Sequence, residues 1–261
     1  MIEQELDIVK KYITEDVENL LPDDLLKSFL SGESKMVRSK LGLLYTKCIN
    51  KALNDNIFII LAATELIHNA SLLHDDVIDN AILRRGKTTI CNKYSQNISI
   101  LCGDYIVGKA TDKLLKLNNN EILKLFNSCV QSMSKAEIKQ YFLRDKVPSI
   151  DEYIEICEGK TASLFVAMLK AIAMINDTSI ENAEKLGRLF GIYFQLKNDM
   201  DKDSAKQDRN NGIYTLLNIL DIEKTDALLD NYRKEVIACI HKLPENMFRD
   251  ELEGLVNNYD R

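Results

Sequence analysis

The 261-residue sequence has little of what interrupts helices, with only three prolines and ten glycines. Average proteins contain roughly 5% proline and 7% glycine, well above the usage here. Because both residues disfavour helix interiors, their scarcity favours a protein built mainly from helices. Apolar residues recur three and four positions apart through most of the chain, which is the period of a helix. We therefore predict an all-α fold.

Other absences exclude whole classes of protein. The six cysteines include no CxxC pair, so neither a zinc site nor a disulfide framework is expected. The acidic start MIEQELDIVKK lacks the apolar segment of a signal peptide. No stretch reaches the ~18 uninterrupted apolar residues that indicate a transmembrane helix. We expect a cytoplasmic protein without a transmembrane segment.

The chain carries no excess of positive charge. Lysine and arginine total 34 against 40 aspartates and glutamates, which gives a net charge of −6 at pH 7. Because general nucleic-acid binding depends on neutralising phosphates, we expect no nucleic-acid partner. Hydrophobic residues make up 46% of the chain, which is enough for a sizeable core.

The polar breaks between the apolar segments are short. The longest, DKDSAKQDRNNG, covers residues 201–212, and none has the length or composition of a linker between domains. We expect a single domain over residues 1–261, with roughly ten helices of ordinary length. Two long apolar helices end in an acidic cluster, at 75–79 and at 198–203.

The first acidic cluster lies in the segment ELIHNASLLHDDVIDNAILRRGKTT, residues 65–89. Because helical residues advance by about 100° each, Asp75, Asp76 and Asp79 share one side of the predicted helix. Neighbouring carboxylates raise one another's pKa or hold cations, and Mg²⁺ prefers such oxygen ligands together with substrate phosphates. The alternative is a solvated helix end, the usual role of an acidic run.

A basic segment with Arg84, Arg85 and Lys87 follows this cluster directly. Guanidinium groups bind phosphate oxygens in a forked geometry. Acids followed by arginines at this spacing therefore indicate a site for a metal-bridged polyphosphate. Simple ion pairs between the two groups are the plainer interpretation.

At these residues the sequence resembles the trans-polyprenyl diphosphate synthases, which lengthen isoprenoid chains head to tail. The first aspartate-rich motif of that family, DDxxD followed by RRG, reads here as Asp75, Asp76, Asp79, Arg84, Arg85 and Gly86. Further matches extend over most of the chain: Lys35 and Arg38 in a degraded GGKRxRP motif, His68 ahead of the acids, Gly103 and Asp104, Lys160 and Thr161 in a KT pair, and Phe194 and Gln195 in an FQ pair.

The resemblance implies an isoprenoid synthase-type bundle of helices around a deep central cavity, usually in a homodimer. It also implies a reaction. An allylic diphosphate such as farnesyl diphosphate ionises with help from up to three Mg²⁺ ions, the double bond of isopentenyl diphosphate attacks the cation, and a proton is lost. The product is a longer all-trans polyprenyl diphosphate, whose apolar chain implies peripheral membrane contact during release.

The resemblance also assigns roles to single residues. The implied metal ligands are Asp75, Asp76 and Asp79, with Asp199 and Asp203 of the second acidic motif. The implied catalytic residues, which hold the allylic diphosphate or stabilise the cation, are Arg84, Lys160, Thr161 and Gln195. The implied ligands of isopentenyl diphosphate are Lys35, Arg38, His68 and Arg85. Taken singly, each has a plainer interpretation, such as a surface charge, a core histidine or a polar side chain that fills a gap.

The second acidic motif departs from the family pattern. DDxxD is expected after FQ, but Asn198 and Lys202 stand at its first and last positions, and only Asp199 is in register. Asp199 and Asp203 are four residues apart, so they share a helix face and could still hold one metal ion. We hypothesise that Lys202 supplies a positive charge near the diphosphate where part of the metal site is lost.

Residues four and five before the first aspartate help to set product length in this family. Here they are Ser71 and Ala70, both small, and Ile67 continues the same face without an aromatic ring. An open pocket floor favours a long product of the quinone side-chain class, and we expect octaprenyl diphosphate. Small residues that merely allow close helix packing are the alternative.

Three other functions stay open at this point. A class I terpene cyclase shares the fold and the DDxxD motif, but the four residues implied to bind isopentenyl diphosphate would have no purpose in it. A short-chain synthase that makes farnesyl or geranylgeranyl diphosphate would need its pocket closed by deeper side chains. A non-catalytic partner subunit of a heteromeric synthase would explain the weakened second motif but not the intact first one.

Overall fold

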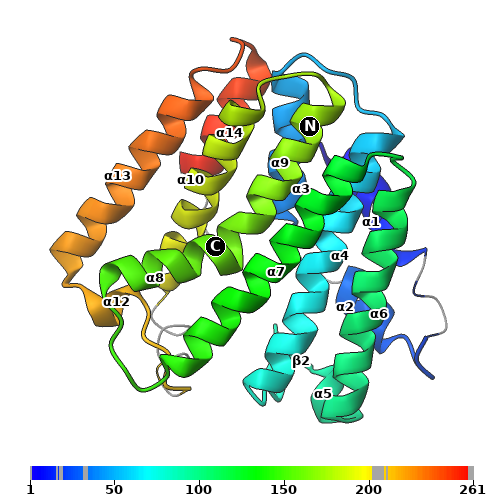
Figure 1. The fold of residues 1–261 in the computed structure, drawn as a ribbon, viewed down its shortest axis with the longest axis vertical. Helices are drawn as coiled ribbons and strands as arrows, with labels where there is room; N and C mark the ends of the chain where they lie inside the picture. The colour runs from blue at the N-terminus through cyan, green and yellow to red at the C-terminus, as the bar shows by residue number, and fades with distance from the viewer. Residues whose placement is uncertain are drawn as a thin grey trace. The chain divides into compact units, whose positions relative to one another are not determined.

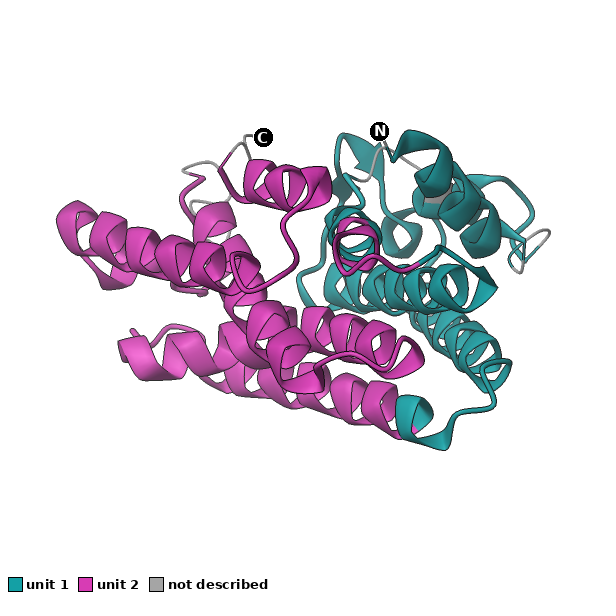
Figure 2. Cartoon of the chain, turned by 90° about the horizontal axis from the view of Figure 1, so that it is seen from above, with its two compact units in different colours: residues 1–43, 52–123 teal, residues 44–51, 124–261 magenta. Residues whose placement is uncertain are grey.

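The computed structural model describes residues 2–15, 17, 20–31, 35–201, 209 and 211–257, and most of them are helical (Figure 1). The prediction of an all-α fold is confirmed. The chain divides into two compact units (Figure 2). Unit 1 comprises residues 1–43 and 52–123, and unit 2 comprises residues 44–51 and 124–261. The single domain expected over residues 1–261 stays a prediction.

Unit 1 holds the N-terminal helices and the one short hairpin of the described residues. Its elements are α1 (Glu3–Thr14), α2 (Leu25–Ser31), the first part of α3 (Val37–Cys48), α4 (Asp55–Ile78), β1 (Leu83–Arg84), β2 (Lys87–Thr88), α5 (Ile90–Lys93) and α6 (Gln96–Leu115). The hairpin was not expected from the sequence, because two-residue strands show no alternation of polar and apolar side chains.

Helix α4 forms the core of unit 1. Every side chain from Ile57 to Ile67 is buried, and the side chain of Asn54 caps the helix by accepting a hydrogen bond from the Ile57 N–H at 3.2 Å. Helices α1 and α6 pack against it. Length and composition alone would let α4 cross a membrane, but 72% of its most apolar window is buried inside the fold. That burial is the pattern of a core helix.

Unit 2 holds the remaining helices. Its elements are most of α7 (Asn120–Phe142), α8 (Ile150–Cys157), the π-helical turn η1 (Glu158–Ala162), α9 (Ser163–Ile175), α10 (Ile180–Asp199), α12 (Leu216–Ile219), α13 (Ile222–Ile240) and α14 (Met247–Asn257). Helix α8 starts at a capping box formed by Ser149 and Glu152. It continues directly into η1 and α9, and such π-turns inside helices are frequent at functional sites.

In unit 2, helix α10 packs closely against η1 and α9. Three rings cluster where they meet, with the centroid of Phe165 5.2 Å from that of Phe190 and 5.5 Å from that of Phe194. The backbones approach most closely at Gly191, where an added Cβ would lie 2.4 Å from the Cα of Ala162. No side chain fits at this position, so the glycine fixes how near α10 lies to the π-turn.

Gly191→Ala tests this close approach. The methyl group would meet backbone atoms of η1 that no rotamer change can move. We expect the free energy of unfolding, measured by urea denaturation, to fall by about 1–3 kcal/mol, as is typical of overpacked core sites. An unfolding free energy equal to that of the wild type would contradict the packing described for α10.

Candidate active site

Asp76 is the buried member of the first acidic motif. Its side chain is only 1% exposed, and its Oδ1 accepts a hydrogen bond from Arg84 Nε at 2.7 Å. Burial raises the pKa of this carboxyl, with Arg84 opposing the shift and Asp79 adding to it. The second oxygen, Oδ2, is buried and has no hydrogen-bond partner among the described residues. One carboxylate oxygen of the motif is therefore tied to a guanidinium and the other is available.

Asp75 and Asp79 lie one turn apart at the end of α4 and are both half-buried. Asp79 ends the helix, and its N–H donates to the Asp75 carbonyl oxygen at 2.9 Å. Within the described ranges, no three acidic, histidine or cysteine side chains are gathered into a complete metal site. The carboxylates of Asp75 and Asp79, with the unpartnered Oδ2 of Asp76, nevertheless fit a hard cation such as Mg²⁺, which takes oxygen ligands.

The hairpin after α4 positions the two arginines. Leu83 pairs with Thr88 and Arg84 with Lys87, which leaves Arg85 and Gly86 as the two turn residues. Both have positive φ, 53° at Arg85 and 74° at Gly86, and two-residue hairpin turns of this kind require that conformation. A positive φ is unusual for arginine, and such outliers cluster at functional sites.

His68 lies close to three guanidinium groups in unit 1. Its pKa is well below the usual value because the ring is enclosed by protein, and because Arg38, Arg85 and Arg84 repel a further positive charge. The imidazole is therefore neutral near pH 7. The structure thus brings together Arg38, His68 and Arg85 as predicted, whereas Lys35 is exposed just ahead of α3. Three cations near a neutral ring are a favourable environment for an anion.

Glu65 is a functional residue that the sequence analysis missed. Its carboxylate is 2% exposed, and Oε1 accepts hydrogen bonds from the Ser39 N–H at 3.1 Å and the Ser39 hydroxyl at 2.7 Å. This contact fastens the start of α3, which carries Arg38, to the middle of α4. The available signal was an acid inside an otherwise apolar run, three residues before His68.

Unit 2 contains a chain of hydrogen bonds that links three of the predicted residues. Thr161 Oγ1 donates to Gln195 Oε1 at 2.8 Å, and Gln195 Nε2 donates to Asp199 Oδ1 at 2.7 Å. The hydroxyl of Tyr153 donates to Asp199 Oδ2 at 2.5 Å. Tyr153 was not predicted, since nothing in its local sequence distinguishes it from an ordinary core tyrosine.

Other predicted residues have different surroundings. Lys160 Nζ donates to Gln140 Oε1 at 2.9 Å and forms an ion pair with Glu137, both on α7. Lys202 and Asp203 lie outside the described residues.

The residues predicted to set product length lie on α4. Ile67 is 4% exposed and Ala70 is 1% exposed. The hydroxyl of Ser71 donates to the His68 carbonyl oxygen at 2.8 Å.

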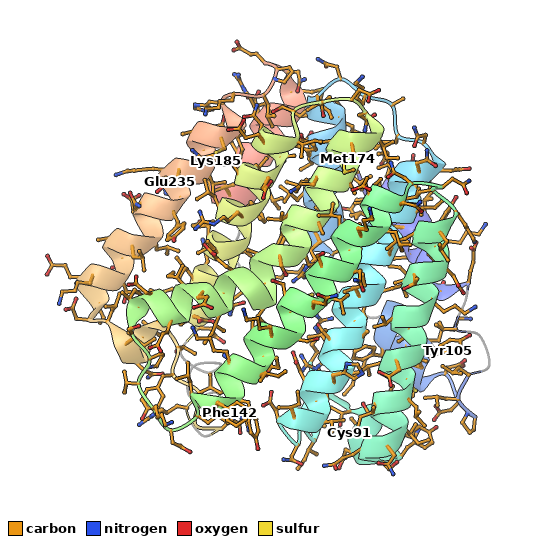
Figure 3. All side chains as sticks on the ribbon, in the orientation of Figure 1. Cys91, Tyr105, Phe142, Met174, Lys185 and Glu235 are labelled. Carbon is orange, nitrogen blue, oxygen red and sulfur yellow. The ribbon has the colours of Figure 1, made fainter. Side chains whose placement is uncertain are left out.

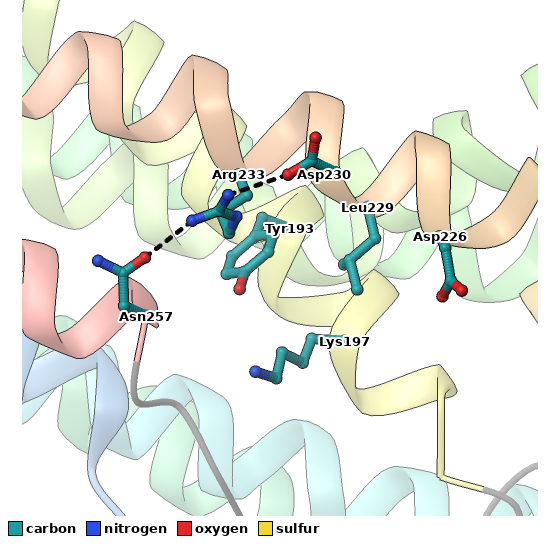
Figure 4. A pocket seen from close by; sticks show the side chains of 7 residues that line it. All are labelled: Tyr193, Lys197, Asp226, Leu229, Asp230, Arg233 and Asn257. Carbon is teal, nitrogen blue, oxygen red and sulfur yellow. Dashed lines mark hydrogen bonds and ion pairs between the residues drawn. The ribbon is translucent and has the colours of Figure 1, made fainter.

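A pocket of about 510 Å³ lies against the opposite face of α10 (Figure 4). Arg233 is held inside it by Asp230 at 3.0 Å and Asn257 at 3.1 Å. Its lining residues are Tyr193, Lys197, Asp226, Leu229, Asp230, Arg233 and Asn257. Two acids face two bases, so the pocket has no net preference for a diphosphate, and it is separate from the Gln195 side of the helix.

His68→Gln tests the neutral histidine. In the unfolded chain a histidine takes up a proton below about pH 6.5, whereas the folded protein keeps His68 neutral. The wild type should therefore lose stability as the pH falls below about 6.5, by up to about 1.4 kcal/mol per pH unit from this group. Urea denaturation from pH 7.5 to 5.5 should show a shallower loss for the variant, and parallel curves would contradict the assignment.

Comparisons with known proteins agree on one family. The profile of the family described as Polyprenyl synthetase matches residues 21–246. A prenyl transferase of Porphyra purpurea is 36% identical over 141 residues, 52% of this chain and 44% of that protein. A prenyl transferase of Cyanidium caldarium is 31% identical over 190 residues, 70% of this chain and 59% of that protein. The chain thus spans about half the length of these curated relatives.

The fold also matches solved structures. A decaprenyl diphosphate synthase from Rhodobacter capsulatus superposes with a TM-score of 0.90 at 19% identity, covering 98% of this chain and 95% of that one. At this identity the likeness establishes the isoprenoid synthase fold. Together with the profile match over residues 21–246, it shows that this chain belongs to the polyprenyl synthetase family.

Proposed function

We propose that the chain is a prenyltransferase, which condenses isopentenyl diphosphate with an allylic diphosphate to give a longer all-trans polyprenyl diphosphate. The observation that carries this proposal is the grouping of Arg38, Arg84 and Arg85 around a neutral His68. The same unit carries the carboxylates of the first acidic motif at the end of α4. A diphosphate site beside a cation site is what two diphosphate substrates and Mg²⁺ require.

The carboxylates of the first motif would hold the metal. Asp75, Asp79 and the unpartnered Oδ2 of Asp76 are the ligands, and we propose up to three Mg²⁺ ions with the allylic diphosphate. When bound, Mg²⁺ neutralises the charge that develops on the departing diphosphate. Arg84 donates through Nε to Asp76, and since a guanidinium has five N–H donors, others stay available for phosphate oxygens.

The isopentenyl diphosphate would bind through Lys35, Arg38, His68 and Arg85. The guanidinium groups supply charge and forked hydrogen bonds. His68 is neutral, so it contributes a directed N–H or ring nitrogen rather than charge. Glu65 keeps α3 fastened to α4 through Ser39, and thereby keeps Arg38 near the ring.

The reaction breaks the C–O bond of the allylic diphosphate, forms a C–C bond to the isopentenyl double bond and releases a proton, which we assign to the departing diphosphate. Thr161 and Gln195 supply fixed dipoles for the allylic cation, and neither is an ionised nucleophile that would trap it. Lys160, which lies beside Glu137 and Gln140, would contribute a positive charge toward the allylic diphosphate.

The product is proposed to be long, with octaprenyl diphosphate as the expected length. Ala70 and Ser71 leave the relevant face of α4 without a bulky ring. We place the reaction in the cytoplasm, with peripheral membrane contact where the apolar product leaves. A non-catalytic partner subunit stays the second candidate, because Asn198 replaces the first aspartate of the second motif.

Incorporation of radiolabelled isopentenyl diphosphate by the purified chain, with Mg²⁺ and farnesyl diphosphate, tests the activity. We expect a ladder of products that ends at a long chain. Asp75→Asn should lower incorporation by about 10²–10³-fold, because charge on the leaving group is then poorly neutralised. Asp226→Asn, an exposed acid on α13, is the matched control and should leave incorporation unchanged. No incorporation by the wild type would point to the partner-subunit role.

Ser71→Phe tests the proposed product length in the same assay. A ring at this position adds bulk one turn before the acidic motif, so we expect the ladder to end several isoprene units earlier while primer consumption continues. Chromatography of the dephosphorylated products gives the readout. A ladder of unchanged length would contradict the role assigned to Ala70 and Ser71.

We also propose a homodimer, on the basis of apolar side chains exposed along α6. Leu101 is 62% exposed, Tyr105 is 38% exposed and Leu115 is 52% exposed. Leu101 and Tyr105 are one turn apart and share a face of the helix (Figure 3, in which Tyr105 marks α6). Exposed apolar side chains that gather on one face are typical of protein–protein interfaces.

Leu101→Asp tests this surface. We expect the wild type to elute from size exclusion at twice the mass of one chain, and the variant at the mass of one chain, because a buried unpaired carboxylate opposes association. The matched control is Ile222→Asp, which changes an isoleucine that is 71% exposed at the start of α13. A dimeric Leu101→Asp, or a monomeric wild type, would contradict the proposed interface.

A further inference from the structure

Asp199 is the one residue of the second acidic motif that keeps the family register, yet its surroundings differ from those of the first motif. It is 7% exposed. Its Oδ1 accepts from Gln195 Nε2 at 2.7 Å and its Oδ2 accepts from the Tyr153 hydroxyl at 2.5 Å. Within the described part of the chain, one oxygen of Asp76 has no hydrogen-bond partner, whereas both oxygens of Asp199 are bonded to protein donors.

One of the two donors to Asp199, Tyr153, lies in a buried apolar environment. The cluster to which it belongs consists of Tyr153, Cys157, Ala162, Ile192, Leu196 and Leu216. A metal ion at Asp199 would have to displace one of these two short hydrogen bonds, the one from Tyr153 being at the edge of this cluster. The two hydrogen bonds already occupy both carboxylate oxygens, so Asp199 does not fit the role of a metal ligand.

The hydrogen bonds instead fix the orientation of the Gln195 amide. An ionised carboxylate only accepts hydrogen bonds, so Gln195 must direct its NH₂ group at Asp199. Its carbonyl oxygen is then on the opposite side of the amide, where it accepts from Thr161 Oγ1 at 2.8 Å. If Asp199 turned, the amide could flip and present a donor where a carbonyl oxygen is needed.

The hydrogen bond from the Tyr153 hydroxyl holds the Asp199 carboxylate in its orientation. Its ring is 5% exposed on α8, and its hydroxyl reaches across 46 residues of sequence to the carboxylate on α10. The π-turn η1 follows α8 directly and carries Thr161. The two ends of the hydrogen-bond chain, Tyr153 and Thr161, therefore come from one continuous helical segment, and Gln195 and Asp199 come from another.

We propose that Asp199 anchors the Gln195 amide instead of ligating Mg²⁺, and that Tyr153 is the positioning residue that holds Asp199 in place. The catalytic consequence rests on the proposed function, since Gln195 is the residue whose dipole would face the allylic cation. The structural part concerns only the orientation of one amide and the metal affinity of one carboxylate.

Nuclear magnetic resonance of protein labelled with ¹⁵N-glutamine tests the anchoring directly. The sequence has only six glutamines, at positions 4, 96, 131, 140, 195 and 207, and loss of one signal in Gln195→Glu assigns Gln195. For the side-chain amide of Gln195 in the wild type, we expect two separate NH₂ proton signals that exchange slowly with solvent. In Tyr153→Phe and in Asp199→Asn, exchange should be faster by about tenfold or more.

Tyr193→Phe is the matched control for this experiment. Tyr193 is also buried on unit 2, but it lies on the opposite face of α10, and its hydroxyl donates to the Val256 carbonyl oxygen at 3.0 Å. This variant loses a buried tyrosine hydrogen bond without touching the chain of bonds. The Gln195 signals should stay as in the wild type. Unchanged Gln195 exchange in both Tyr153→Phe and Asp199→Asn would overturn the proposal.

Calorimetric titration of Mg²⁺ in the presence of inorganic diphosphate tests the metal part without any turnover. Asp75→Asn should weaken Mg²⁺ binding by about tenfold or more, whereas Asp199→Asn should change it by less than about twofold. Equal weakening by the two variants would show that Asp199 is a metal ligand and would overturn the proposal.

Kinetics separate the positioning role from the proposed function itself. Tyr153→Phe should lower kcat by about tenfold with both KM values unchanged, and Tyr193→Phe should leave kcat as it is. A kcat for Tyr153→Phe equal to that of the control would overturn the positioning role. If the wild type incorporates no isopentenyl diphosphate, the proposed function fails, while the resonance and titration results still decide the proposal about Asp199.

Discussion

The burial of two carboxylates, Asp76 on α4 of unit 1 and Asp199 on α10 of unit 2, is the constraint on which the proposed roles of the two acidic motifs depend. A buried charge is costly unless it is paired and hydrogen-bonded. Asp76 is paired with one guanidinium through one oxygen, so its second oxygen stays available to a cation. Asp199 is satisfied on both oxygens by neutral donors. On the proposed account, the same chemical group would hold a metal in one motif and orient an amide in the other.

The position of the arginines in unit 1 also depends on a buried carboxylate. Arg84 is held by Asp76, and the hairpin turn at Arg85 and Gly86 fixes where the two arginines lie relative to α4. Burial, reinforced by the positive charges of Arg38, Arg85 and Arg84, lowers the pKa of His68 and keeps its ring neutral near pH 7. A cluster of cations that repel one another is stable only if the fold holds it together. We propose that the cluster binds an anion, with a diphosphate as the expected ligand.

Features formed by residues close together in the sequence could be predicted, whereas contacts between residues far apart in the sequence could not. The Asp75–Asp79 spacing spans one helical turn, and the arginine pair follows within the same segment, so both could be recognised by position alone. Glu65 and Tyr153 could not, since their partners lie 26 and 46 residues away and only folding brings them near. The π-turn at Thr161 was also not predicted, because a single five-residue turn is too short to be recognised from the spacing of apolar residues. Asp199 was predicted as a metal ligand from its motif, whereas its hydrogen bonds to Tyr153 and Gln195, which the motif does not reveal, are the basis of the anchoring role proposed above.

The central claim is that Asp199 is bonded to Tyr153 and Gln195 and is not a metal ligand, whereas the first acidic motif holds the metal. A crystal structure of the chain soaked with Mn²⁺ and a non-hydrolysable allylic diphosphate analogue, with anomalous scattering to locate the ions, measures this directly. The account predicts Mn²⁺ on Asp75 or Asp79, with Asp199 still bonded to Tyr153 and Gln195. A Mn²⁺ peak within about 2.5 Å of an Asp199 oxygen, a coordination distance, would contradict it.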